Sequence, residues 1–210
     1  MDRAQRGTKL GCWMELSLPH LINLLDHPDS LQPLHDRRSP EGFRDAAVIV
    51  PLVQRDGKTH LIFNKRAANL DNHAGQVGFP GGRRDPEDTS LLITAQRELD
   101  EELSIAPDQH RPLLRLPPRL VISHYQVTPF VSLVNPDANI IAEPGEVAYT
   151  FEVPLEFLMD PSAATSARRD IFGETRVFYA WDYAGETIWG ATGRIIADFL
   201  IAIGARHLEA

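Results

Sequence analysis

A glycine turn followed by an amphipathic helix rich in glutamate is the feature that most constrains how this chain folds. Residues 81–105 read GGRRDPEDTSLLITAQRELDEELSI. The apolar residues of the helical part recur at helical spacing and form a stripe, which consists of Leu92, Ala95, Leu99 and Leu103. Such a stripe needs a sheet or a second helix to cover it, while the other side of the helix faces a cleft. Asp88, Thr89 and Ser90 are the candidates for its N-cap.

Three carboxylates lie beside that stripe. Glu98, Glu101 and Glu102 fall on one arc of a helix that turns by about 100° per residue. Like charges this close repel, so the arrangement costs stability unless a cation lies among them. Hard oxygen ligands suit Mg²⁺ or Mn²⁺, which bind through a few carboxylates and substrate phosphates. A solvated acidic face is the alternative for any charge run, as it is for Asp100 on roughly the opposite side. The glycine turn, the spacing and Arg97 together favour a metal site.

The segment resembles the Nudix box, G-x5-E-x7-R-E-U-x-E-E-x-G-U with U aliphatic, of a family that hydrolyses nucleoside diphosphates linked to another moiety. Residues 97–105 match it in register, except that Ser104 stands where the pattern has glycine. Counting from Gly82, the glutamate position holds Asp88, and the arginine comes one residue late. The loop before the helix is therefore one residue longer than the pattern, at a place where insertions cost little. This leaves the helix carboxylates intact and the role of Asp88 open.

A second motif lies immediately upstream. Residues 61–82 read LIFNKRAANLDNHAGQVGFPGG and resemble the signature of coenzyme A pyrophosphatases within the Nudix family. The match is in register at Arg66, Ala67, Leu70, His73, Gly75, Gln76, Val77, Phe79, Pro80, Gly81 and Gly82, while Asn64 replaces a threonine. The resemblance extends from about Asp45 to the helix predicted near the C-terminus, and it implies a Nudix α/β/α sandwich with a mixed β-sheet between helices.

The resemblance also implies roles for the acidic residues. Glu98 and Glu102 would be the principal ligands of Mg²⁺ or Mn²⁺, with Glu101 and the backbone carbonyl of Gly82 as further ligands. One of these carboxylates, or Glu146 from a later loop, would be the general base. For Glu146, a plain solvated glutamate in a turn is an equal alternative. Arg97 counts among the catalytic residues because it is placed to hold one of the box carboxylates by a bidentate ion pair.

Substrate contacts are expected from the coenzyme A signature. His73 and Gln76 are placed to contact the nucleotide or the pyrophosphate, although a structural hydrogen bond is an equal alternative for His73. Arg66 either binds a phosphate, including a ribose 3′-phosphate, or pairs with a box carboxylate. Phe79 and Gly81 are included in the predicted substrate site, with fixing of the backbone path as the stronger interpretation of their role.

Bulk properties bound the class of protein. The 210 residues allow one well-cored domain, and 43% apolar with 24% charged residues is typical of a globular protein. A net charge of −8 argues against nucleic acid as a partner. Cys12 is the only cysteine, so a reducing compartment fits. No apolar run has the length of a signal peptide or a membrane span, which predicts a cytoplasmic protein without membrane association.

The chain divides into a lead-in and one domain. Residues 1–44 form the lead-in, where leucines between 16 and 25 predict a short amphipathic helix that packs on its own domain or on a second subunit of a homodimer. Residues 45–205 form the Nudix domain. Strands are predicted at 46–53, 60–64, 127–134, 146–151, 175–181 and 187–189, short apolar runs at 113–116 and 119–123, and helices at 154–159 and 192–203.

Three functions remain open at this point. The first is hydrolysis of coenzyme A or acyl-coenzyme A to phosphopantetheine or its acyl form and adenosine 3′,5′-bisphosphate. The second is Nudix hydrolysis of another nucleotide, such as ADP-ribose, a dinucleotide or a nucleotide sugar, since fold does not fix substrate. The third is a silent Nudix-like binding domain. Retention of the repulsive carboxylate cluster speaks against the third, because a binding module gains nothing from it.

Overall fold

The structure is a computed structural model, and it describes residues 18–25, 29–31, 39–70, 73–171, 173–205 and 207–208. Cys12 and most of the predicted lead-in lie outside the described residues. The described part of the lead-in contains the helix α1, Leu18–Leu25, in agreement with the leucine pattern.

Eight strands form one large mixed sheet. Its central path runs β3-β2-β1-β7-β5, with β4 on β1, β6 on β7 and β8 on β2. The pairing of β1 with β7 is parallel, and the other pairings are antiparallel. The strands are β1 Arg44–Arg55, β2 Lys58–Arg66, β3 Val77–Gly78, β4 Gly81–Arg83, β5 His110–Arg115, β6 Arg119–Val121, β7 Tyr125–Val134 and β8 Val147–Pro154. The central strand β1 is buried almost throughout, because both faces of the sheet are covered.

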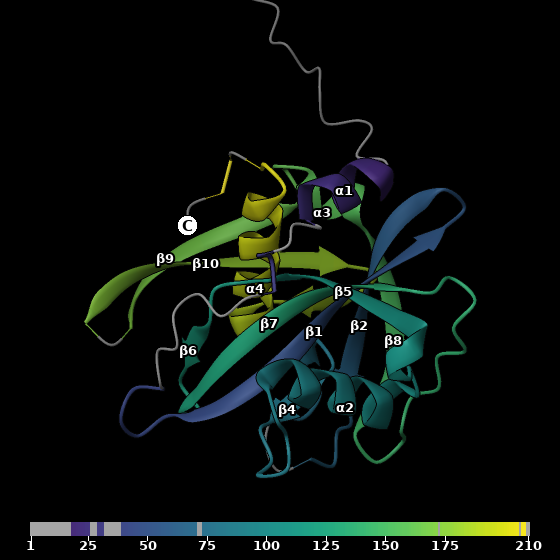
Figure 1. The fold of residues 1–210 in the computed structure, drawn as a ribbon. Helices are drawn as coiled ribbons and strands as arrows, with labels where there is room; N and C mark the ends of the chain where they lie inside the picture. Colours follow the sequence, from purple (N-terminus) through teal and green to yellow (C-terminus); the bar gives the residue numbers. More distant parts are fainter. Residues whose placement is uncertain are drawn as a thin grey trace, which may run out of the picture.

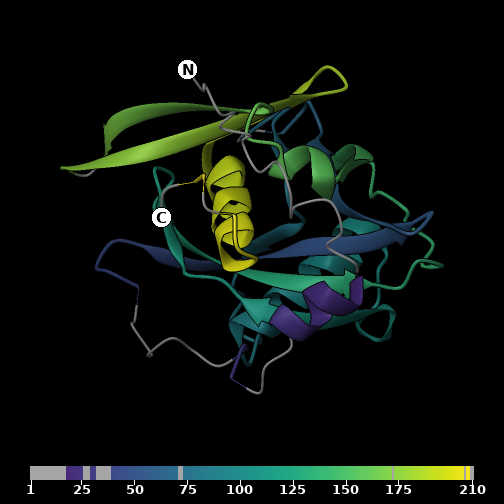
Figure 2. The same ribbon diagram turned by 90° about the horizontal axis from the view of Figure 1, so that it is seen from above.

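Helices cover the two faces of this sheet. The helix α2, Leu91–Leu103, packs on one face, and α4, Gly190–Ala202, lies on the other (Figure 1). Beyond α4 lies a three-stranded antiparallel sheet in the order β11-β10-β9, so that α4 is enclosed between two sheets (Figure 2). Its strands are β9 Ala164–Ile171, β10 Glu174–Tyr183 and β11 Glu186–Ile188. The predicted mixed sheet between helices is confirmed, and the sheet beyond α4 is an addition to it.

Two hydrophobic clusters hold the layers together. The α2 stripe packs through Ala95, Leu99 and Leu103 against Ala47 and Ile49 of β1. The larger cluster joins the opposite face of β1 to α4 and to the small sheet, through residues such as Val50, Phe199 and Trp181. Alternate residues of β1 thus enter different clusters, as the two-residue period of a strand requires. The carboxylate side of α2 is left outside both clusters.

The remaining elements complete the domain. They are α3 Leu155–Met159 and a 3₁₀ turn at Pro107–Gln109. Leu21 and Leu25 of α1 are buried in the chain's own core, so this helix packs on its own domain, and a homodimer stays a prediction. Among the described residues, none of the helices has the length and apolar character needed to span a membrane.

Candidate functional site

The ends of α2 are fixed by two serines. The side chain of Ser90 accepts a hydrogen bond from the backbone N–H of Ile93 at 3.2 Å, which makes Ser90 the N-cap among the three predicted candidates. Ser104 ends the helix in the left-handed region, with φ of 55°. Glycine is the residue best suited to that conformation, which explains physically why the Nudix box pattern has glycine here.

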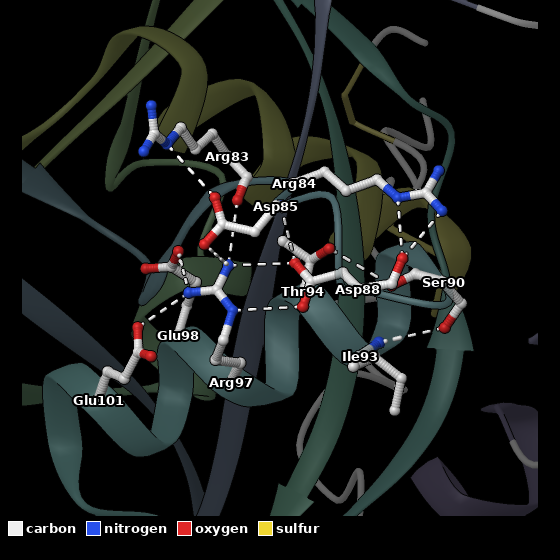
Figure 3. A network of polar contacts seen from close by, with 10 residues as sticks. All are labelled: Arg83, Arg84, Asp85, Asp88, Ser90, Ile93, Thr94, Arg97, Glu98 and Glu101. Carbon is white, nitrogen blue, oxygen red and sulfur yellow. Dashed lines mark hydrogen bonds and ion pairs between the residues drawn. The ribbon is translucent and has the colours of Figure 1, made fainter.

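Arg97 is the centre of a polar network at the start of the site (Figure 3). One terminal nitrogen donates to Glu98 and to Glu101, each at 2.8 Å. The other donates to the backbone carbonyl of Arg83 at 3.1 Å and to Asp88 at 3.1 Å. Arg97 was predicted to hold one box carboxylate, and it contacts two of them together with the loop before the helix. The guanidinium therefore ties α2 to the segment that follows the glycine turn.

Asp88 takes a structural role in this network. Its carboxylate is buried and accepts from Arg97 and from the backbone N–H of Asp85. The hydrogen bond from Arg97 is the main reason that the pKa of Asp88 falls to about 2. The carboxylate is therefore a fixed anion that orients Arg97. The longer loop still brings Asp88 to Arg97. The role of Asp88 that the sequence left open is therefore to hold this arginine.

Glu98 lies directly against the glycine turn. A Cβ added to Gly82 would be 2.4 Å from Glu98 Oε1, so a side chain here would displace this carboxylate from its place beside the backbone. Burial is the main cause of a raised pKa for Glu98, opposed by the hydrogen bond from Arg97 and supported by the charges of Glu101 and Glu146. Glu98 and the backbone of Gly82 are thus adjacent, as a shared metal site requires.

Glu102 is the most buried acidic residue of the cluster, with 4% of the residue exposed. Asn64 on β2 donates to its Oε2 at 2.7 Å, and a terminal nitrogen of Arg66 lies 3.9 Å from its Oε1. Burial raises the pKa of Glu102 to about 8, and the charges of Glu98 and Glu146 act in the same direction. Of the two alternatives for Arg66, the structure places it as a neighbour of a box carboxylate.

The predicted acidic set is only partly gathered. Glu98 and Glu102 interact electrostatically and both sense the charge of Glu146, which is exposed at the entrance to β8. Glu101 turns outward to Arg97, with 59% of its side chain exposed. No three acidic, histidine or cysteine side chains among the described residues form a ready metal-binding group. The complete ligand set and the identity of the general base therefore stay predictions.

The predicted substrate-contacting residues shape the turn between β2 and β4. His73 adopts a left-handed conformation with φ of 57°, and its Nδ1 lies 2.9 Å from Gln76 Oε1. The carbonyl of Gln76 accepts from the backbone N–H of Arg66 at 2.9 Å. Phe79 is buried and stacks on Phe63, with ring centroids 4.9 Å apart. These contacts are structural, and contact with a substrate stays a prediction for each residue.

Gly81 explains why the turn needs two glycines. Its φ is +154°, and an added Cβ would lie 2.4 Å from the carbonyl oxygen of Ala47 on β1. The backbone of β4 therefore approaches β1 more closely than a side chain permits. This close approach places the neighbouring Gly82 against Glu98.

Asn64 is a site residue that the sequence reasoning passed over. It was noted as a departure from the signature, and no role was given to it. The predicted strand ended at Asn64, whereas β2 runs on to Arg66, and two residues that are two apart on a strand share a face. Arg66 was a candidate to bind a phosphate or a box carboxylate. A polar side chain on the same face as Arg66 is therefore a candidate site residue as well.

Comparison with known proteins identifies the family. A family model described as NUDIX domain matches residues 42–175. Two relatives named "Uncharacterized Nudix hydrolase NudL", from Photorhabdus laumondii and Pectobacterium atrosepticum, are each 37% identical to this chain. The matches cover 84% and 87% of this chain, and 95% and 91% of the relatives.

Solved structures show weaker similarity. A Caenorhabditis elegans Ap4A hydrolase in a binary complex is 19% identical over 54% of this chain and 81% of its own, with a TM-score of 0.46. A MutT/nudix family protein from Enterococcus faecalis is 13% identical over 79% of this chain and 65% of its own, with a TM-score of 0.48.

Proposed function

The chain belongs to the NUDIX family, and on that premise we propose that it hydrolyses the pyrophosphate bond of coenzyme A or an acyl-coenzyme A. The products are adenosine 3′,5′-bisphosphate and phosphopantetheine or its acyl form. One observation carries the substrate assignment, which is the long in-register match of residues 61–82 to the coenzyme A pyrophosphatase signature. Family membership alone supports a hydrolase of small nucleotide substrates and leaves the substrate open.

The position of this segment in the fold supports the proposal. It begins in β2, where Asn64 and Arg66 adjoin Glu102, and it ends in β4, where Gly82 adjoins Glu98. The signature and the box therefore meet at the same two carboxylates. Between them, the backbone bond from Arg66 to Gln76 closes the loop and brings its residues to the edge of this site. A segment that determines substrate specificity is expected beside these two carboxylates.

The residues present fit a divalent cation such as Mg²⁺ or Mn²⁺. Burial raises the pKa of Glu102, the charge of the half-buried Glu98 raises it further, and a cation beside the two carboxylates would remove that repulsion. Gly82 has no side chain in the way of Glu98, and we propose its backbone carbonyl as a further oxygen ligand. Oxygen donors of this kind match the preference of Mg²⁺ and Mn²⁺. We propose Glu98, Glu102 and Gly82 as the ligands, with Glu101 released from Arg97 as a further one.

The bound ion would neutralise the charge of the pyrophosphate and lower the pKa of a water molecule. The chain supplies the other requirements. Arg97 keeps Glu98 in place through the 2.8 Å hydrogen bond, and Asp88 keeps Arg97 in place. Glu146 is exposed and electrostatically coupled to both Glu98 and Glu102, so it is suited to take the proton of the attacking water. The new phosphorus–oxygen bond forms as the bridging one breaks, and the leaving phosphate carries the departing charge.

A product analysis tests the proposal. The protein is incubated with Mg²⁺ or Mn²⁺ and, separately, with coenzyme A, acyl-coenzyme A, ADP-ribose, dinucleotides and nucleotide sugars. We expect adenosine 3′,5′-bisphosphate chiefly from coenzyme A or its acyl forms. Preference for ADP-ribose or a dinucleotide would assign another Nudix substrate, and absence of every product would indicate a binding domain.

Matched variants connect the activity to the site. Glu98→Gln removes one proposed ligand without changing the size of the side chain, and we expect turnover to fall by orders of magnitude. Asp100→Asn makes the same kind of change on the same helix, at an exposed position outside the polar network. It is expected to leave turnover unchanged. Near-native activity of Glu98→Gln would show that the metal assignment is wrong.

A further inference from the structure

Asn64 is a buried amide aimed at a buried carboxylate. It lies on β2, where 2% of the residue is exposed, and its Nδ2 donates to Glu102 Oε2 at 2.7 Å. Its Oδ1 is buried and has no hydrogen-bond partner among the residues that the structure describes. The coenzyme A signature has threonine at this position, so the amide is a property of this chain.

The short contact to Glu102 comes from Asn64 and not from the positively charged side chain of Arg66. The terminal nitrogen of Arg66 is 3.9 Å from Glu102 Oε1, which is beyond hydrogen-bond distance. Arg66 therefore contributes charge without fixing the direction of the carboxylate. The hydrogen bond from the Asn64 amide fixes both distance and direction for one oxygen, because hydrogen bonds are directional. The other oxygen, Oε1, faces Arg66 at 3.9 Å, and the backbone N–H of Gly81 also donates to this carboxylate.

The arrangement is costly for the fold. An amide oxygen buried without a donor loses its hydration, and a buried carboxylate loses more. An apolar residue of similar size at position 64 would remove the first cost and would pack well in the centre of a sheet. Local conflicts of this kind concentrate at functional sites. The amide is therefore better explained by its effect on Glu102 than by a contribution to stability.

We propose that Asn64 is a positioning residue, whose side-chain N–H holds one oxygen of the Glu102 carboxylate so that the other is presented to the divalent ion. The inference rests on the metal site of the proposed function and deepens it. Hydrogen-bond partners of metal ligands orient them, and loss of such a partner typically weakens metal affinity about 10–100-fold. The same loss is expected when Asn64 no longer donates.

The test measures Mn²⁺ binding without substrate. The full chain is stripped of metal and titrated with Mn²⁺, and the free ion is followed by its electron paramagnetic resonance signal. Asn64→Leu keeps the approximate size of the side chain and removes the donor. We expect its Kd for Mn²⁺ to rise by about tenfold or more. Its kcat on coenzyme A should fall while KM for coenzyme A changes little, because Asn64 acts on the ligand and not on the substrate.

A control on the same strand separates positioning from general damage to β2. Thr59 is buried and accepts a hydrogen bond from Gln54 Nε2 at 2.6 Å. Five residues of strand place it about 16 Å from Asn64. Thr59→Val also removes a buried polar group, so it matches the cost of the change without touching the site. It is expected to bind Mn²⁺ as the native chain does.

A second variant keeps the inference testable should Asn64→Leu fail to fold. Asn64→Thr suits a strand, and its hydroxyl is one bond shorter than the amide, so it reaches Glu102 poorly. We expect weaker Mn²⁺ binding than in the native chain. Native-like Kd and kcat in the variants that fold would overturn the role of Asn64, even if the native chain hydrolyses coenzyme A. Conversely, Mn²⁺ binding that depends on Asn64 in a chain inactive on coenzyme A would overturn the substrate assignment alone.

Discussion

Replacement of Glu102 by glutamine should make the metal-free protein more stable at alkaline pH while it lowers turnover. Burial raises the pKa of Glu102 to about 8 from the ordinary glutamate value of 4.5. The folded chain therefore holds this proton more tightly than the unfolded chain. The contribution of Glu102 to the free energy of unfolding is therefore fully present below pH 4.5, is lost as the pH rises toward 8, and is constant above.

The size of the effect follows from the same pKa values. One pKa unit corresponds to about 1.36 kcal/mol, so ionisation of Glu102 removes about 5 kcal/mol of stability between these limits. Glu102→Gln has no charge to bury, and its amide oxygen still accepts from Asn64. For a chain of this length, 1 kcal/mol shifts Tm by about 2–4 °C. The variant should therefore have a Tm higher than that of the native chain by on the order of 10 °C at pH 9.

Thermal unfolding in the presence of EDTA measures this difference from pH 5 to pH 9, with Asp100→Asn as the control for loss of a helix carboxylate. The Tm of Glu102→Gln minus that of the native chain should be small at pH 5 and should grow through pH 8. Excess Mg²⁺ should then stabilise the native chain more than the variant, because only the native chain keeps the ligand. A Tm difference that does not change from pH 5 to pH 9 would refute the claim that ionisation of the buried Glu102 destabilises the fold.

Three further substitutions test other parts of the site. Gly82→Ala should retain the fold and lose activity. The new Cβ would lie 2.4 Å from Glu98 Oε1 and would push the movable end of this side chain aside. Circular dichroism checks the fold, and a turnover assay checks the activity. Ser104→Gly should raise stability by about 1 kcal/mol in urea unfolding, because its φ of 55° disfavours any residue with a Cβ; an unchanged midpoint would contradict this. Asp88→Asn should lower stability by about 1.5–3 kcal/mol and weaken turnover through Arg97, and activity as high as in the native chain would show that Arg97 is held by its other partners.

Sequence patterns predicted the elements that position the site. The stripe on α2 and the apolar runs of β1 and β7 appear in the structure where they were expected, because each repeats with the period of its element and is covered on the face concerned. The N-cap Ser90 was among the predicted candidates because its short side chain can accept from a free backbone N–H of the first turn. In each case the pattern and the tertiary contact agree.

The strand β9 has no such signal in the sequence. Its residues read ATSARRDI, and those from Thr165 to Asp170 are exposed on both faces, so apolar alternation is missing. It forms because β10 offers a partner in antiparallel register. Pairing of this kind depends on the neighbour and not on the local pattern, which is why the small sheet was predicted only as the hairpin of β10 and β11.

The contacts within the site show the same division. Arg97 was identified, but its bonds to Asp88 and to the carbonyl of Arg83 depend on how the loop folds back, and a motif does not contain that information. Phe79 was included in the predicted substrate site, with fixing of the backbone path as the stronger interpretation, and its ring is buried against Phe63. A motif thus indicates which residues matter, while packing decides whether each one acts on chemistry or on the backbone.

Anomalous scattering from crystals soaked with Mn²⁺ locates the ion. We expect a strong peak within coordination distance of Glu98 and Glu102 and near the carbonyl of Gly82. The peak should be lost in Glu98→Gln. No peak at these residues, or a peak elsewhere in the chain with Glu98 still bound to Arg97, would contradict a metal-dependent hydrolase site in this position.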